Sequence, residues 1–188
     1  ELLHRLFVEH LDLDAELRER LRARRELERG EDVSRLVDEI AREQRPVAHV
    51  IRIGEGFASA TLPKAEWTHG AHWAAAFWLI LKRPDINPER DMPGMIRRYN
   101  DAVGTPNTDS EGYHETITRG SLIIAREFIA QQADDPLLHD LCDRLFASRF
   151  GRNDWLFEHW SKDVLFSAKA RKQWVAPNLN PLRACLGN

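Results

Sequence analysis

Apolar side chains recur three and four residues apart along most of the chain, as they do on one face of a helix. Residues 64–82 show this spacing most strongly, and Arg83-Pro84 ends the run. No internal repeat and no low-complexity block interrupts the pattern. The pattern therefore predicts an all-α protein, a single-domain helical bundle with a charged N-terminal helical extension. The predicted helices cover residues 1–29, 32–45, 64–82, 93–103, 111–131, 136–147 and 153–160.

Proline, glycine and asparagine mark the expected breaks between these helices. Pro46 is predicted to stop the helix over 32–45. The segment 47–63 is the best candidate for a strand, although a helix containing Gly54 and Gly56 is equally compatible with it. Three prolines in residues 84–94 predict an irregular, exposed loop. The Pro- and Asn-rich tail, residues 174–182, is predicted to wrap the surface.

Charge is distributed unevenly along the chain. Residues 14–44 are dense in both signs and contain no aromatic residue, which indicates a solvated helical face with Glu–Arg pairs at i,i+3 and i,i+4 spacing. This contrast predicts two parts: a helical extension, residues 1–45, and a helical-bundle metal-site domain, residues 46–188. The N-terminal helices are the part that could form a homodimer.

Bulk composition limits the classes of partner. The chain has 188 residues, which suits one domain, and its net charge of −3 offers no basic excess for nucleic acid or an anionic membrane. No apolar run reaches the roughly 18 residues of a membrane span. Cys142 and Cys185 lie far apart outside any C-x-x-C pair, which is typical of a reduced compartment. We expect a cytoplasmic protein that binds neither nucleic acid nor membranes.

Three histidines lie at positions that predict a metal site. His69 and His72 are three residues apart in the predicted helix over 64–82, about 60° from each other around its axis. His114 falls on the apolar seam of the predicted helix over 111–131. Packing the two seams together would bring three imidazoles into one pocket, an arrangement that holds a divalent metal with one position open. The predicted ligands are His69, His72 and His114, and the predicted cofactor is one divalent transition metal, Fe, Zn, Cu or Ni.

Residues beside His114 supply candidate catalytic groups. Glu115 follows the presumed ligand directly, as the general base follows the first ligand in zinc-peptidase helices. An i,i+4 ion pair with Arg119 explains Glu115 equally well. Tyr113 is a second candidate catalytic residue, and Arg97 is a candidate substrate contact.

Acidic residues near the histidines leave a second arrangement open. Glu66 and Glu111 each precede a histidine in E-x-x-H spacing, which is half of the di-iron carboxylate pattern of four-helix bundles. His49, in an apolar segment before the first of these helices, is a reserve fourth ligand.

The segments 62-LPKAEWTHGAH-72, 96-IRRYN-100 and 112-GYHETIT-118 resemble, in the same order, a family of small, functionally uncharacterised bacterial proteins. The family pattern is L-P-x-x-x-W-T-H-x-x-H, then I-R-R-Y-N, then G-Y-H-E-T-I-T. The tail 164-VLFSAKARKQWVAPNLNPL-182 is similar to the family's C-terminal segment. The resemblance supports the choice of His69, His72, His114 and Glu115 and implies no particular reaction. Residues 1–45 look like an extension beyond the pattern.

The first functional hypothesis is a mononuclear metal-dependent enzyme with a three-histidine site between two core helices. We favour non-haem oxidative chemistry on a small-molecule substrate, because aromatic surroundings suit a reactive intermediate. A zinc-dependent hydrolase is the first alternative, since zinc lowers the pKa of bound water to ~7. The second alternative is a non-enzymatic helical binding module whose histidines and Glu115 form a buried polar network.

Overall fold

The structure is a computed structural model that describes the backbone of residues 33–134 and 136–182 and the side chains of 46–134 and 136–182. The chain divides between Glu43 and Gln44 into two units, and the description below concerns the second. Residues 1–32 of the predicted N-terminal extension lie outside the described residues, so the extension and its homodimer stay predictions.

Helices and turns make up the described part of the chain, which contains no strand. This confirms the predicted all-α fold class. The α-helices are α3 (Val33–Ala58), α4 (His69–Lys82), α5 (Pro88–Ala102), α6 (Glu115–Ala130), α7 (Leu138–Ala147), α8 (Lys162–Leu165) and α9 (Ala168–Lys172), and the 3-10 helices are η1 (Lys64–Glu66), η2 (Arg149–Gly151) and η3 (Trp155–Glu158).

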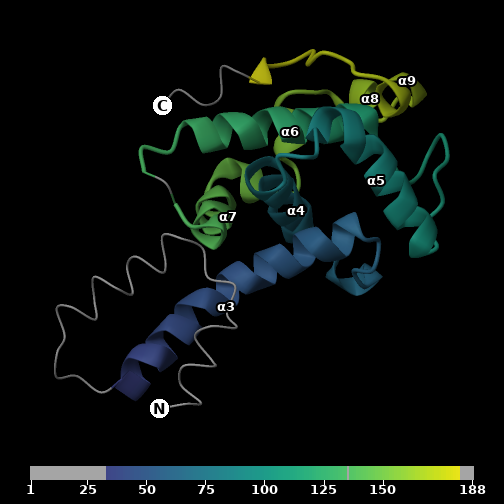
Figure 1. Ribbon diagram of the computed structural model, residues 1–188. Coiled ribbons are helices and arrows are strands. Elements are labelled where there is room, and N and C mark those ends of the chain that lie inside the picture. The colour runs from purple at the N-terminus through teal and green to yellow at the C-terminus, as the bar shows by residue number, and fades with distance from the viewer. Residues whose placement is uncertain (1–32, 135, 183–188) are drawn as a thin grey trace. The chain divides into compact units, whose positions relative to one another are not determined.

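Helix α4 is the central element, and α5, α6 and α7 pack around it (Figure 1). It is buried at Ala71 and at every position from Trp73 to Leu79. A helix that is apolar on all sides is shielded from water only when other elements pack around it on every side, which explains why α4 lies in the core. The strong apolar run seen in the sequence is thus the core helix of the bundle.

Helix α3 contradicts the predicted stop at Pro46 and decides between the strand and the helix left open for the segment after it. It runs through Pro46 and ends at Ala58, so the predicted stop at Pro46 and the strand candidate over 47–63 are wrong, and the alternative of a helix containing Gly54 and Gly56 is confirmed up to Ala58. Val50 and Phe57 are buried on the face of α3 that meets the core, and this burial offsets the one helical hydrogen bond that proline removes. Gly54 allows α3 to lie close to the Trp78 ring of α4, because a Cβ at this position would be only 2.3 Å from that ring.

Three further helix boundaries move from their predicted places. Helix α5 begins at Pro88, inside the predicted loop, because Asn87 caps it and proline suits the first turn. Helix α6 begins at Glu115 rather than at residue 111. The predicted helix over 153–160 is reduced to the short helix η3.

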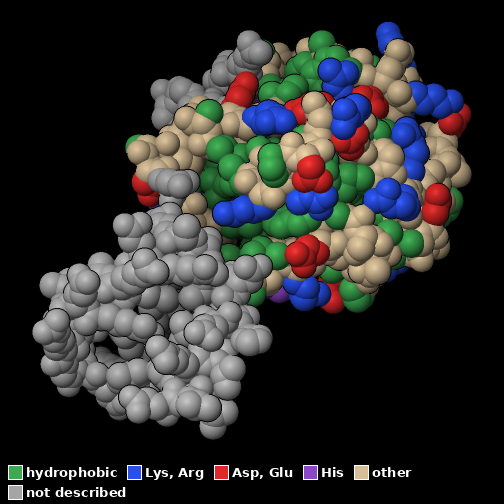
Figure 2. Space-filling view, viewed as in Figure 1, with side chains coloured by type: hydrophobic (Ala, Val, Ile, Leu, Met, Phe, Trp, Pro, Cys, Tyr) green, Lys and Arg blue, Asp and Glu red, His purple; other side chains and the backbone are tan. Residues whose placement is uncertain are grey.

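The visible surface of the molecule carries Lys and Arg side chains interleaved with Asp and Glu, with hydrophobic side chains between them (Figure 2). Within the described ranges, no helix is both long and apolar enough to cross a membrane.

Candidate functional site

His114 lies at the first turn of α6 as its N-cap and not inside the helix, which corrects its predicted place on the seam. Its Nδ1 accepts the Ile117 N–H at 3.3 Å, so Nδ1 carries no proton. The proton is therefore on Nε2, which donates to the Leu165 carbonyl oxygen at 2.9 Å. Both ring nitrogens of this buried imidazole are occupied by backbone groups.

The electrostatic surroundings of His114 favour its neutral form. Desolvation lowers its pKa below the usual 6.5, and the nearby Arg171 guanidinium lowers that pKa further, while the Leu165 hydrogen bond opposes the shift. Arg171 itself donates to the carbonyl oxygens of Gly112 and Tyr113 at 3.3 and 3.1 Å. A neutral imidazole with its lone pair on a backbone N–H has no electron pair left for a metal.

Three of the predicted site residues meet beside His114. The Tyr113 hydroxyl donates to Glu115 Oε2 at 2.7 Å, and the Arg97 guanidinium lies 4.2 Å from the centre of the Tyr113 ring. Arg119 Nη1 lies 3.9 Å from Glu115 Oε1, which is the i,i+4 ion pair that was one of the two interpretations of Glu115. Desolvation and the Glu115 carboxylate raise the pKa of Tyr113, so its hydroxyl stays protonated.

Thr116 is a site residue that the sequence reasoning did not single out. It is fully buried, donates to the Gln173 carbonyl oxygen at 2.9 Å and accepts the Val175 N–H at 3.0 Å. Together with His114 and Arg171 it joins the start of α6 to residues 165–175. We call these three residues, His114, Thr116 and Arg171, the α6 clasp. In the sequence, Thr116 stood out only as one residue of the segment 112-GYHETIT-118.

The loop before the clasp is fixed by its own contacts. Gly112 has φ +75°, and a Cβ there would lie 2.3 Å from the Pro106 carbonyl oxygen. Asn107 Oδ1 accepts from Asn100 Nδ2 at 2.9 Å and from the Tyr113 N–H at 3.3 Å. The conformation required at Gly112 explains why glycine precedes the Tyr-His-Glu-Thr run.

The start of α4 holds the other two predicted ligands. The Thr68 hydroxyl caps the helix by accepting the Ala71 N–H at 3.3 Å. His69 Nε2 accepts the Trp73 indole N–H at 3.3 Å, which leaves its proton on Nδ1. His72 Nδ1 donates to the Thr68 carbonyl oxygen at 2.7 Å, so Nε2 keeps a free lone pair. Among the ring nitrogens of the three predicted ligands, Nε2 of His72 is the one that could bind a metal without first breaking a hydrogen bond.

His72 is exposed, yet one part of its ring rests on Trp67, with the ring centres 4.1 Å apart. This partial desolvation lowers the pKa of His72, so the imidazole is neutral at pH 7. Trp67 also stacks on Phe57 at 4.7 Å and contacts Tyr99 at 5.0 Å. The Tyr99 hydroxyl is buried without a hydrogen-bond partner. Trp67 is therefore a packing centre between α3, α4 and α5.

Glu66 and Glu111 are not in the helical positions that the di-iron pattern needs. Glu66 lies in η1, before α4 begins, and forms an ion pair with Arg52. Glu111 is an exposed residue of the loop before α6. His49, the reserve ligand, is exposed on α3. The helical E-x-x-H pairs inferred from the sequence are thus wrong, because both helices begin later than predicted.

The three predicted ligands do not form one cluster. Within residues 46–134 and 136–182, no group of three or more His, Cys, Asp or Glu side chains could hold a metal ion. His69 and His72 lie at the start of α4 and His114 at the start of α6, with both nitrogens of His114 occupied. The residues present do not fit a three-histidine metal site in this conformation.

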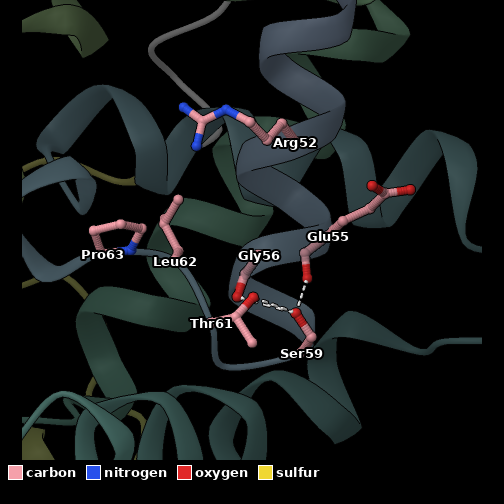
Figure 3. Close-up of a pocket in the computed structure, with 7 residues that line it drawn as sticks. All are labelled: Arg52, Glu55, Gly56, Ser59, Thr61, Leu62 and Pro63. Atoms are coloured by element: carbon pink, nitrogen blue, oxygen red, sulfur yellow. Dashed lines mark hydrogen bonds between the residues drawn. The ribbon is translucent and has the colours of Figure 1, made fainter.

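A pocket of about 300 Å³ lies at the end of α3 (Figure 3). Ser59 Oγ donates to the Glu55 carbonyl oxygen at 2.7 Å and lies 2.9 Å from Thr61 Oγ1. The Arg52 and Glu55 side chains diverge in Figure 3, so the two charged groups of the lining do not converge on one point. None of the sequence-predicted site residues lines this pocket, whose lining is Arg52, Glu55, Gly56, Ser59, Thr61, Leu62 and Pro63.

Neither a protein-family model nor a curated protein nor a solved structure matches this chain. The resemblance drawn from the W-T-H-x-x-H, I-R-R-Y-N and G-Y-H-E-T-I-T segments therefore stays a prediction.

Proposed function

We propose that this chain is a non-enzymatic helical binding module in which the predicted metal and catalytic residues serve the fold. The observation that carries the proposal is the pair of hydrogen bonds at His114: Nδ1 accepts from Ile117 and Nε2 donates to Leu165. Binding a metal through this imidazole would break one of them and leave a buried backbone group unpaired, which costs about 1–3 kcal/mol.

The groups around His114 support the same proposal. Tyr113 and Glu115 are bonded to each other, and Thr116 and Arg171 are bonded to backbone atoms from distant parts of the chain. A polar network in which every member has a partner gives rigidity and a unique arrangement of elements.

Metal analysis tests the proposal directly. Tag-free wild-type protein, His72→Ala and His114→Asn are each assayed for transition metals by mass spectrometry, as purified and after reconstitution with Fe, Zn, Cu or Ni. We expect less than stoichiometric metal in all three and no proton release on adding metal. One equivalent of a single metal in the wild type, lost in both variants while the helical circular dichroism persists, would contradict the proposal.

A metal-dependent enzyme is the second candidate, favoured by one observation. His72 is exposed, and its Nε2 has no hydrogen-bond partner among the described residues. With His69 beside it, the pair would hold an ion at the start of α4, where iron or copper would supply oxidative chemistry and zinc hydrolytic chemistry. Against this candidate, the exposed N–H groups of a helix start disfavour a cation. In the assay above, metal lost in His72→Ala but kept in His114→Asn would favour it.

A further inference from the structure

The corner between α8 and α9 carries Phe166, which at 57% is the most exposed large apolar side chain of the described residues. These two short helices lie on the outside of the bundle, beside α6 (Figure 1). Leu165, the residue before Phe166, is fully buried. The corner therefore places one apolar side chain in the core and the next one in water.

Hydrogen bonds fix the backbone on both sides of Phe166. Its N–H donates to the Lys162 carbonyl oxygen at 2.9 Å. The Ser167 hydroxyl donates to the Val164 carbonyl oxygen at 2.7 Å and accepts the Ala170 N–H at 3.1 Å, which caps α9. Because the corner is already ordered in the free protein, a contact made by the Phe166 ring costs little further ordering of the chain.

Phe166 forms a small aromatic surface together with Phe157 of η3. The two rings meet edge to face, with their centres 5.8 Å apart and their planes at 70°. The Lys162 ammonium lies 5.1 Å from the centre of the Phe157 ring. An exposed ring and an exposed cation thus lie against the same aromatic side chain. We call Phe157, Lys162 and Phe166 the aromatic corner.

The segment that contains the aromatic corner is basic in an otherwise acidic chain. Residues 162–172, with the sequence KDVLFSAKARK, hold four basic residues and one acidic residue, whereas the whole chain has a net charge of −3. Two of the four basic groups are engaged within the protein: Lys172 pairs with Asp109, and Arg171 donates to the Tyr113 carbonyl oxygen.

The other two cations, Lys162 and Lys169, are exposed on either side of Phe166. Among the residues that the structure describes, neither ammonium forms an ion pair with a carboxylate. The acidic side chain of the segment itself, Asp163, is exposed. Glu158, beside Phe157 in η3, lies 3.7 Å and 3.9 Å from two arginine side chains of the 149–152 turn. The positive charge beside the ring is therefore available to a partner.

We infer that the aromatic corner docks an acidic segment of another protein that carries a large apolar side chain. The apolar side chain would cover the rings of Phe166 and Phe157, and its neighbouring carboxylates would meet Lys162 and Lys169. Buried aromatic side chains supply much of the binding energy of protein interfaces, and complementary charge selects the partner and speeds association. This inference names the partner class of the proposed binding module and rests on that proposal.

An anionic membrane is the other partner of matching charge, and it fits the corner less well. A flat bilayer surface would meet the exposed Asp163 carboxylate together with the two lysines, whereas a single peptide segment can pass beside it. One aromatic side chain is also a small apolar anchor, and such an anchor alone gives only marginal attachment to a bilayer. We therefore assign the corner to a protein partner.

The test titrates the full chain, labelled with ¹⁵N, with a short peptide of Glu and Asp residues that has one central Phe. We expect amide shifts concentrated in residues 157–169 that saturate with added peptide. A peptide with Ser in place of Phe, and one with Gln and Asn in place of the acids, should each bind at least about tenfold more weakly. Shifts spread over the whole surface, or equal binding of the three peptides, would overturn the inference.

Single substitutions at the corner have matched controls elsewhere on the protein. Phe166→Ser and Lys162→Glu should each weaken peptide binding at least about tenfold, and because both side chains are exposed the variants should keep the wild-type circular dichroism. Phe146→Ser, at an aromatic ring of α7 that is 40% exposed, and Lys64→Glu in η1 should leave binding unchanged. Equal losses in the corner and control variants would contradict the assignment.

Two further measurements separate the other occupants. Co-sedimentation with phosphatidylcholine–phosphatidylglycerol vesicles that is lost in Phe166→Ser, without peptide binding, would overturn the inference in favour of a membrane. A dimer that Phe166→Ser abolishes would overturn it in favour of a second copy. Metal content of the same samples reports separately on the proposed function: peptide binding by a stoichiometrically metal-loaded protein contradicts only that proposal, and no binding by a metal-free protein contradicts only this inference.

Discussion

The starts of α4 and α6 both combine threonine and histidine, but the hydrogen bonds of their histidines reach different parts of the chain. Each has a polar cap that accepts a backbone N–H three residues on: the Thr68 hydroxyl for α4 and the His114 imidazole for α6. At α4 the histidine bonds stay within four residues, His69 to Trp73 and His72 to Thr68. At α6 the second imidazole nitrogen reaches Leu165, 51 residues away.

This difference separates a local cap from a tertiary joint. A hydroxyl cap satisfies one helix end and leaves the rest of the chain free. An imidazole cap has a second nitrogen, so it can satisfy the helix end and a distant carbonyl oxygen together. In the α6 clasp, His114 uses this property to attach the end of α8, while the Thr116 hydroxyl binds residues 173 and 175 and Arg171 attaches α9. A histidine at a helix start therefore indicates a tertiary contact only when the hydrogen-bond partners of both its ring nitrogens are known.

The largest effect should come from His114→Ala. It removes the cap and leaves the Leu165 carbonyl oxygen without a donor, so we expect the free energy of unfolding to fall by about 2–4 kcal/mol. Equilibrium urea unfolding measures this loss. His114→Asn is the matched control, because asparagine caps the helix but is too short for Leu165, and it should lose about half as much. A loss below about 0.5 kcal/mol for alanine would show that no tertiary joint exists here.

Thr116→Val tests the bonds of the α6 clasp to residues 173 and 175. Valine has nearly the same shape but leaves the Gln173 carbonyl oxygen and the Val175 N–H unpaired, so we expect a loss of about 1–3 kcal/mol in urea unfolding. Ser121→Ala, at a half-buried position five residues further along α6, is the control and should change stability by less than about 0.5 kcal/mol. Equal losses in the two variants would contradict a specific role for Thr116.

Acid should weaken the packing of His114 at the α6 start. The pKa of His114 is lower in the folded protein than the 6.5 of a free imidazole, so the unfolded chain binds a proton at pH values where the folded chain does not. Stability is therefore full above pH 6.5 and falls as the pH drops from there toward the folded pKa. Urea unfolding from pH 8 to 5 should show a shallower decline in His114→Asn than in wild type. Parallel curves would contradict this assignment.

The smallest effect should come from the α4 start. His72 is exposed and bonds only the first turn of its own helix, so His72→Ala should cost less than about 1 kcal/mol in urea unfolding. His69→Ala is the companion variant, since it removes one bond to Trp73. A loss in His72→Ala as large as that of His114→Ala would show that the two helix starts are equivalent, against the comparison drawn above.

The fold class could be predicted from the sequence because apolar spacing reports directly on which faces are buried. Helix α4 shows this best, with an apolar run that could only be covered on all sides. The ends of the helices were harder to predict than the fold class. Pro46 was predicted to stop a helix, and strand and helix were both left open for the segment containing Gly54, but tertiary packing keeps α3 helical through both residues, and Gly54 serves the contact with Trp78.

The candidate site was predicted in part. The sequence singled out Tyr113, Glu115 and Arg97, which do lie together, and it offered the Glu115–Arg119 pair as one interpretation. It could not place His114, because a shift of the helix start by four residues turns a seam position into a cap. Nor could it reveal Thr116, whose partners Gln173 and Val175 are distant in sequence and are backbone atoms, which leave no pattern in side-chain type.

The most direct test of the central claim is the tautomer of His114, measured by long-range ¹H–¹⁵N NMR of the histidine rings at pH 7.5 with and without added Zn²⁺, Ni²⁺ or Cu²⁺. If His114 joins α6 to Leu165, its ring is a single neutral tautomer with the proton on Nε2, and substoichiometric metal leaves its resonances unchanged. A proton on Nδ1, or ring resonances that shift or broaden together with those of His69 and His72 on adding metal, would contradict the account.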